Sequence, residues 1–245
     1  QKIIIQNQEC GLRLEKDICK FTYISDDNYK VQIGMAKSTK SGSPVSGDSS
    51  LHIKLQDGKY LLVLSDGMGS GPEAMKSSKI AVKMLERLLA AGFEKDVSLK
   101  LINSTISANT EEDMYATLDI EILDLFNGNM EFIKNGACPT YVKRGREVQL
   151  LKSMSLPTGI LNNVDLVVYD YDLQDGDILV MCTDGVIDSN KEYLNKQLWL
   201  KYLLEDIEIN DAQKIADIII SEAIDNDFGN QKDDMSVIVA KVTKK

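Results

Sequence analysis

The segment 60–71 places an apolar run directly before a carboxylate and three alternate glycines. Residues 60–64 are mostly Leu and Val, a composition typical of a buried strand. Asp66 follows, then the glycines, then Pro72, and proline is favoured in the first turn of a helix. An unpaired aspartate at the end of a core strand is costly to bury. The sequence therefore predicts that Asp66 binds backbone donors, a basic group or a metal ion.

The same pattern occurs near the C-terminus. An apolar run at 178–182 is followed by Thr183, Asp184 and Gly185. A third acidic position, Asp233 with Asp234, directly precedes the apolar run 237–240. Carboxylates at the ends of several core strands indicate one site with oxygen ligands, the kind that Mg²⁺ and Mn²⁺ prefer.

The chain is long enough to bury a substantial core, because it has 245 residues, 43% of them hydrophobic. We find no internal repeat, linker or composition shift, so we expect a single domain over residues 1–245. No apolar run approaches the roughly 20 residues of a membrane helix. The chain begins with Gln1, and we expect it to be the C-terminal part of a longer protein, whose missing N-terminal part could anchor the parent in a membrane.

Charge and cysteine usage narrow the partners and the compartment. The net charge is -10, so nucleic acid is not an expected partner. The four cysteines, at positions 10, 19, 138 and 182, form no CxxC pair. We interpret them as reduced thiols and expect a cytoplasmic location for this segment, without membrane contact.

Hydrophobic periodicity divides the chain into hairpin strands and grouped helices. We expect helices at 72–91, 94–110, 194–205 and 210–226. We expect a final strand at 235–242 and strand pairs at 17–25 with 29–38, 51–56 with 59–65, 117–126 with 130–134, 139–143 with 147–151, and 164–172 with 177–183. This order predicts an α+β domain with antiparallel sheets and helices on their outer faces.

The Asp57-Gly58 turn allows a geometric prediction, because Asp-Gly favours a two-residue hairpin loop. If Gln56 pairs with Lys59, Asp66 lies opposite Ser49 and Asp48 lies opposite Gly67. The two carboxylates are then close neighbours across the ladder, within reach of one ion. Without a cation, two such charges would repel each other.

Taken in order, the acidic motifs resemble those of the metal-dependent protein phosphatases of the 2C type. The resemblance extends from about residue 30 to the end and is strongest for members that act in sporulation. It rests on 46–48 (Ser-Gly-Asp), 65–71 (Ser-Asp-Gly-Met-Gly-Ser-Gly), 135–139 (Asn-Gly-Ala-Cys-Pro), 156–160 (Leu-Pro-Thr-Gly-Ile), 183–185 (Thr-Asp-Gly) and 233–236 (Asp-Asp-Met-Ser).

The resemblance implies a four-layer αββα sandwich with two central antiparallel sheets and two Mn²⁺ or Mg²⁺ ions at one end. Asp66 would bridge both ions, and Gly67 would offer its carbonyl oxygen. Asp48 would hold the second ion, and Asp184 and Asp233 the first. Asp234 is a weaker ligand candidate.

The resemblance also implies the reaction and its partner. The substrate would be phosphoserine on a protein similar to an anti-anti-sigma factor, within the control of sigma factors during sporulation. A metal-bound hydroxide would attack phosphorus in line, and the four aspartates Asp48, Asp66, Asp184 and Asp233 would be the catalytic groups. A homodimer is a further possibility.

Two positions depart from the pattern of the wider family. Met68 stands where eukaryotic members carry a presumed histidine acid, and His52, the only histidine, is expected to face Val63 on the hairpin, too far away to replace it. A phosphate-binding arginine has no clear equivalent. Lys37 and Lys40 are the nearby candidates.

Two other functions remain open at this point. The glycines at 67–71 could form a nucleotide-binding turn, but their GxGxG spacing and the adjacent Asp66 disfavour a pyrophosphate. A non-catalytic phosphoprotein-binding module with the same fold is the second alternative. The presence of all four carboxylates argues against it, and a turnover assay with and without Mn²⁺ separates the two.

Overall fold

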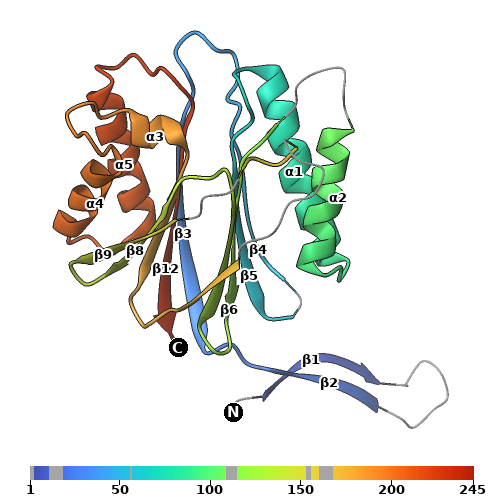
Figure 1. The fold of residues 1–245 in the computed structure, drawn as a ribbon. Coiled ribbons are helices and arrows are strands. Elements are labelled where there is room, and N and C mark those ends of the chain that lie inside the picture. Colours follow the sequence, from blue (N-terminus) through green and yellow to red (C-terminus); the bar gives the residue numbers. More distant parts are fainter. Residues whose placement is uncertain (1–2, 11–18, 56, 109–114, 153–155, 160–167) are drawn as a thin grey trace.

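The computed structural model of the chain describes residues 3–10, 19–55, 57–108, 115–152, 156–159 and 168–245. Two five-stranded antiparallel sheets pack face to face, and helices cover both outer surfaces (Figure 1). The predicted four-layer αββα sandwich is therefore confirmed. No helix within these described ranges is long and apolar enough to cross a membrane.

The first sheet has the strand order β10-β7-β6-β5-β4 and is covered by α1 and α2 (Figure 1). The elements span β4 (Ser49–Lys54), β5 (Lys59–Ser65), α1 (Pro72–Ala90), α2 (Lys95–Ser107), β6 (Leu118–Asp124), β7 (Asn129–Asn135) and β10 (Val168–Asp172). Alternate residues of β5 and β6, including Leu61, Val63 and Ile120, pack with Leu85 and Ile102 of the two helices. The apolar residues of α1 and α2 recur at helical spacing and face these strands. This pattern explains why both helices form where the sequence predicts them.

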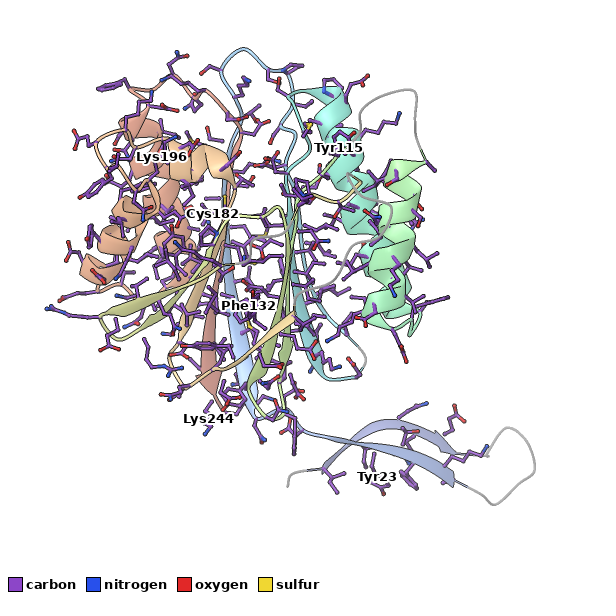
Figure 2. The ribbon with its side chains drawn as sticks, viewed as in Figure 1. Tyr23, Tyr115, Phe132, Cys182, Lys196 and Lys244 are labelled. Atoms are coloured by element: carbon purple, nitrogen blue, oxygen red, sulfur yellow. The ribbon has the colours of Figure 1, made fainter. Side chains whose placement is uncertain are left out.

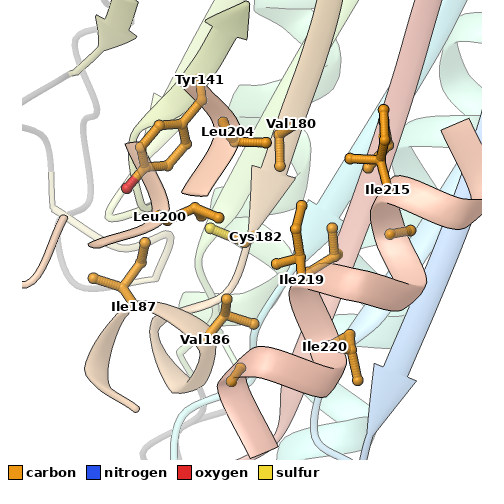
Figure 3. Close-up of a cluster of buried hydrophobic side chains, with 14 of the residues drawn as sticks. Tyr141, Val180, Cys182, Val186, Ile187, Leu200, Leu204, Ile215, Ile219 and Ile220 are labelled. Carbon is orange, nitrogen blue, oxygen red and sulfur yellow. The ribbon is translucent and has the colours of Figure 1, made fainter. Parts of the chain in front are cut away.

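The second sheet has the order β3-β12-β11-β8-β9, with α4 and α5 on its outer face and α3 at one end (Figure 1). The elements span β3 (Tyr29–Ser38), β8 (Thr140–Arg144), β9 (Glu147–Leu151), β11 (Ile178–Cys182), α3 (Asp184–Asp188), α4 (Gln197–Asp206), α5 (Ala212–Asn226) and β12 (Met235–Lys244). Figure 3 shows this outer core, in which Cys182 and Val180 meet Leu200 and Ile219.

The remaining strands, β1 (Ile3–Cys10) and β2 (Cys19–Ser25), form a separate two-stranded ribbon apart from the sandwich (Figure 1). Ile3, Ile5 and Tyr23 of this ribbon are exposed, and Figure 2 shows Tyr23 away from the main core. The predicted hairpin of 17–25 with 29–38 is therefore wrong. Strand β2 pairs with β1, and β3 pairs with β12.

The predicted hairpin of 164–172 with 177–183 is also wrong. Strand β10 pairs with β7 in the first sheet, and β11 pairs with β8 and β12 in the second. The turn at 174–176 therefore carries the chain from one sheet to the other. The amide of Leu173 donates to Gly128, and the amide of Val242 donates to Asp177. Residues 164–167 lie outside the described ranges.

The β4–β5 hairpin forms, but its register differs from the prediction by one residue. Ser49 lies opposite Ser65, and the amide of Leu55 donates to the carbonyl of Lys59 at 2.8 Å, so three residues close the loop instead of two. Gly58, with a φ of 80°, supplies the left-handed conformation that such a loop needs. Asp48 precedes Ser49 and Asp66 follows Ser65, so the two carboxylates lie just beyond the last pair of the ladder, at the same end.

Two of the four cysteines, Cys138 and Cys182, agree with the prediction of reduced thiols. Cys138 and Cys182 are free thiols, and burial raises the pKa of both. Cys182 lies in the outer core of the second sheet (Figure 3). The side chain of Cys10 is outside the described set.

Candidate active site

Strand ends from both sheets bring the predicted carboxylates to one end of the sandwich. Asp48 immediately precedes β4, and Asp66 immediately follows β5 in the first sheet. Asp184 begins α3 directly after β11, and Asp233 lies just before β12 in the second sheet. A hydrogen bond from Thr183 Oγ1 to Asp48 Oδ2, at 3.0 Å, joins the two sheets at this end.

The electrostatics show that these carboxylates are close to one another. Burial, followed by the charges of Asp48 and Asp184 and then of Asp233, raises the pKa of Asp66 to about 9. Burial also raises the pKa of Asp184, although this side chain is partly open to solvent, and the charge of Asp233 adds to the shift. Uncompensated negative charge therefore accumulates around Asp66.

Asp48 is the most enclosed member of the group, with 3% of its surface exposed. Burial raises its pKa to about 6, although the nearby hydroxyls of Ser236 and Thr183 and the charge of Lys37 act in the opposite direction. Its Oδ1 atom is buried without a hydrogen-bond partner among the described residues. A buried carboxylate oxygen without a donor is costly unless a cation or water meets it.

Backbone geometry holds Asp66 and Gly67 in place. The amide of Asp66 donates to Thr117 Oγ1 at 2.9 Å, and the amide of Thr117 donates back to the Asp66 carbonyl at 2.8 Å. A Cβ atom on Gly67 would lie 1.9 Å from the carbonyl oxygen of Ala74 in α1, so only glycine allows this packing. A Cβ on Gly47 would lie 3.5 Å from the Gly67 oxygen, which puts that carbonyl beside the Asp48 loop.

The donor set fits a hard divalent cation. It consists of carboxylate and carbonyl oxygens, with one buried oxygen lacking a partner and a strongly raised pKa at the central aspartate. Among the described residues, no group of three or more acidic, histidine or cysteine side chains is already arranged closely enough to hold a metal ion. An ion bound between the sheets would therefore have to draw the carboxylates together.

Asp234 has a different environment from its neighbour Asp233. Its Oδ1 accepts from the amide of Lys40 at 2.9 Å, and its Oδ2 accepts from the amide of Gly47 at 2.8 Å. The side chain is buried and secures both ends of the loop that delivers Asp48. This role agrees with its lower rank as a ligand candidate.

Lys37 and His52, the two basic side chains considered for the site, are each hydrogen-bonded to another group of the protein. Lys37 Nζ donates to the backbone carbonyl of Asp48 at 2.7 Å, so it supports the loop. His52 lies opposite Leu62, one residue from the predicted Val63, and its Nδ1 is 2.9 Å from the hydroxyl of Tyr60. Met68 is exposed and supplies no proton.

Sequence reasoning missed two threonines that position the carboxylates, Thr117 and Thr183. Thr183 Oγ1 donates to Asp48 and accepts from the amide of Ser236 at 3.0 Å, and it is 4% exposed. The hydroxyl residue that precedes each Asp-Gly motif was the available signal for Thr183. Thr117 is a loop residue before β6, and no sequence pattern marks it.

We expect Thr183→Val to lower Mn²⁺ affinity about tenfold, because Asp48 loses the donor that orients it. Isothermal titration with Mn²⁺ measures the change, and urea unfolding measures stability separately. Thr243→Val, at the far end of β12, is the matched control and should leave the affinity unchanged. Equal affinities for the Thr183 and Thr243 variants would show that Thr183 has no positioning role.

Comparison with known proteins decides the family. The family model described as stage II sporulation protein E matches residues 56–243. Stage II sporulation protein E of Priestia megaterium is 36% identical over 242 residues, which cover 99% of this chain and 41% of that protein. The Bacillus subtilis (strain 168) protein is 38% identical over 218 residues, covering 89% of this chain and 26% of its own length.

The chain belongs to the stage II sporulation protein E family. It spans less than half the length of these two relatives. Its fold matches the structure of the PP2C phosphatase domain and a regulatory-domain fragment of SpoIIE from Bacillus subtilis, with a TM-score of 0.87 and 34% identity. That match covers 100% of this chain and 70% of the other.

The predicted resemblance to 2C-type phosphatases, including their sporulation members, is confirmed, and the chain carries a phosphatase domain of the SpoIIE family. A serine/threonine phosphatase of S. agalactiae shares the fold alone, with a TM-score of 0.70 at 19% identity. The nucleotide-binding alternative is not supported. The roles of the individual site residues stay predictions.

Proposed function

We propose that this domain hydrolyses phosphoserine on a protein substrate and that it requires two divalent cations, Mn²⁺ or Mg²⁺. The proposal rests above all on the buried Asp48 Oδ1 without a partner among the described residues, next to an Asp66 whose pKa is raised to about 9 by burial and by the neighbouring carboxylates. Asp48, Asp66, Asp184, Asp233 and the carbonyl of Gly67 would hold the cations.

The side chains of the domain have two tasks in this reaction. The four carboxylates hold the cations, which when bound supply an activated water and neutralise charge on the phosphate. Thr117 and Thr183 fix the positions of Asp66 and Asp48. Among the described residues, no histidine lies at the end of the sandwich that carries the four carboxylates. We therefore expect the proton for the serine oxygen to come from water.

The protein partner is proposed from the family alone. Its relatives include the phosphoserine phosphatase RsbU of Bacillus subtilis, which is 24% identical over 202 residues. We propose a small phosphoprotein similar to an anti-anti-sigma factor as the substrate. Phosphate release from such a protein, compared with a phosphotyrosine peptide, tests the substrate class.

Removal of divalent cations is expected to abolish turnover, and Mn²⁺ should restore it at least as well as Mg²⁺. The reason is that every proposed ligand is a hard oxygen donor. Phosphate release from a phosphoserine protein, before and after treatment with EDTA, measures the effect. Full activity in excess chelator would contradict the metal assignment, and binding without turnover in Mn²⁺ would favour the non-catalytic alternative.

A further inference from the structure

A groove of about 440 Å³ opens beside Asp48, between helix α1 and the strands β3 and β4. Asp48 and Lys37 line it at the active-site end. Its apolar lining includes Leu51, Met75 and Val82. The groove therefore begins at the proposed metal site and continues along α1.

Lysines dominate the charged lining of this groove. Lys79 and Lys83, four residues apart on α1, are exposed on the same side of the helix. Neither has an ion-pair partner among the described residues, whereas Lys37 donates to the Asp48 carbonyl. The lining carboxylates are Asp48, which a bound cation would neutralise, and Glu86.

We propose that this groove binds an acidic segment next to the phosphoserine of the protein substrate, a proposal that rests on the proposed function. Lys79 and Lys83 would meet carboxylates of that segment, and the apolar lining would take an aliphatic side chain between them. Complementary charges at the edge of a binding surface increase the association rate and favour matching partners. Added salt weakens both effects.

The test uses two phosphoserine peptides of equal length, one with glutamates and one with glutamines beside the phosphoserine. We expect the wild-type domain to have a kcat/KM about tenfold higher for the acidic peptide, through KM, with the preference falling as salt rises. The double variant K79E/K83E should lose this preference. Its turnover of p-nitrophenyl phosphate should be unchanged, because that compound is too small to extend from the proposed metal site to Lys79 and Lys83.

A matched double variant, K100E/K214E, changes the net charge by the same amount on exposed lysines outside the groove and should keep the preference. Equal kcat/KM for the two peptides, or an equal loss in both double variants, would overturn the proposal. Anisotropy of a labelled acidic peptide gives a second readout. Binding that depends on Lys79 and Lys83, without any phosphate release, would support the groove while contradicting the proposed function.

Discussion

Replacement of Asp66 by Asn is expected to lower kcat on a phosphoserine protein by about 1,000-fold or more. Asn keeps the size of the side chain but removes the charge that would lie between the cations. Without metal, the variant should be at least as stable as the wild type, because the charges of Asp48, Asp184 and Asp233 already oppose ionisation of Asp66. Steady-state phosphate release and urea unfolding separate the two effects.

Asp57→Asn is the matched control for this experiment. Asp57 also precedes a glycine, but it lies exposed in the β4–β5 turn, where its Oδ1 accepts from the amide of Lys59. We expect its activity to stay within about twofold of the wild type. Similar losses in the Asp57 and Asp66 variants would show that the effect is not specific to the site.

The second large effect concerns a charged network buried between the sheets, next to the site. Lys134 Nζ donates to Asp119 Oδ1 at 2.5 Å and to Thr140 Oγ1 at 2.7 Å, and Thr140 donates to Glu121 at 2.6 Å. The side chains of Lys134 and Asp119 are 1% and 3% exposed. Burial raises the pKa of Asp119, and burial with the charge of Asp119 raises that of Glu121 to about 8.

Lys134→Met is expected to reduce the free energy of unfolding by about 3–5 kcal/mol, because it leaves buried carboxylates without their cation. Lys95→Met is the control, since the pair formed by Lys95 of α2 and Glu131 of β7 is about one-third exposed and is expected to contribute less than about 1 kcal/mol. Urea unfolding measures both. If Lys134→Met lost no more unfolding free energy than Lys95→Met, Lys134 would not stabilise the buried carboxylates. Adding Asp119→Asn to Lys134→Met should restore part of the lost stability.

Glu121 gives this network a pH dependence with a definite sign. Its pKa is higher in the folded state, about 8, than the ordinary 4.5, so folding takes up a proton between these values. The contribution of Glu121 to stability is therefore present below about pH 4.5 and is lost as the pH rises towards 8. Glu121→Gln should flatten this part of the pH profile.

Features set by local pattern could be predicted from the sequence. The apolar stripe of α1 with Pro72 at its start, and the apolar run of β5 before Asp66, placed both elements within a residue or two. The hairpins β6–β7 and β8–β9 followed from their turns. The positions of Asp48, Asp66, Asp184 and Asp233 at strand ends followed from the same reasoning.

Features set by tertiary context could not be predicted in this way. The turn at 174–176 is the same locally whether it closes a hairpin or crosses to the other sheet. The β4–β5 register differs by one residue from that of a two-residue hairpin, and Gly58 adopts a positive φ in the turn. Asp119, Glu121 and Lys134 alternate along their strands like surface residues, and only the facing sheet makes them buried.

Asp48, Asp66, Asp184 and Asp233 are proposed to hold together the cations that turnover requires. Isothermal titration of the chelator-treated domain with Mn²⁺, with phosphate release assayed in the same samples, tests it most directly. We expect two Mn²⁺ per wild-type chain, activity that rises with their binding, and loss of both the binding and the activity in Asp66→Asn. Equal Mn²⁺ binding by the wild-type and Asp66→Asn domains, or phosphate release without bound metal, would contradict it.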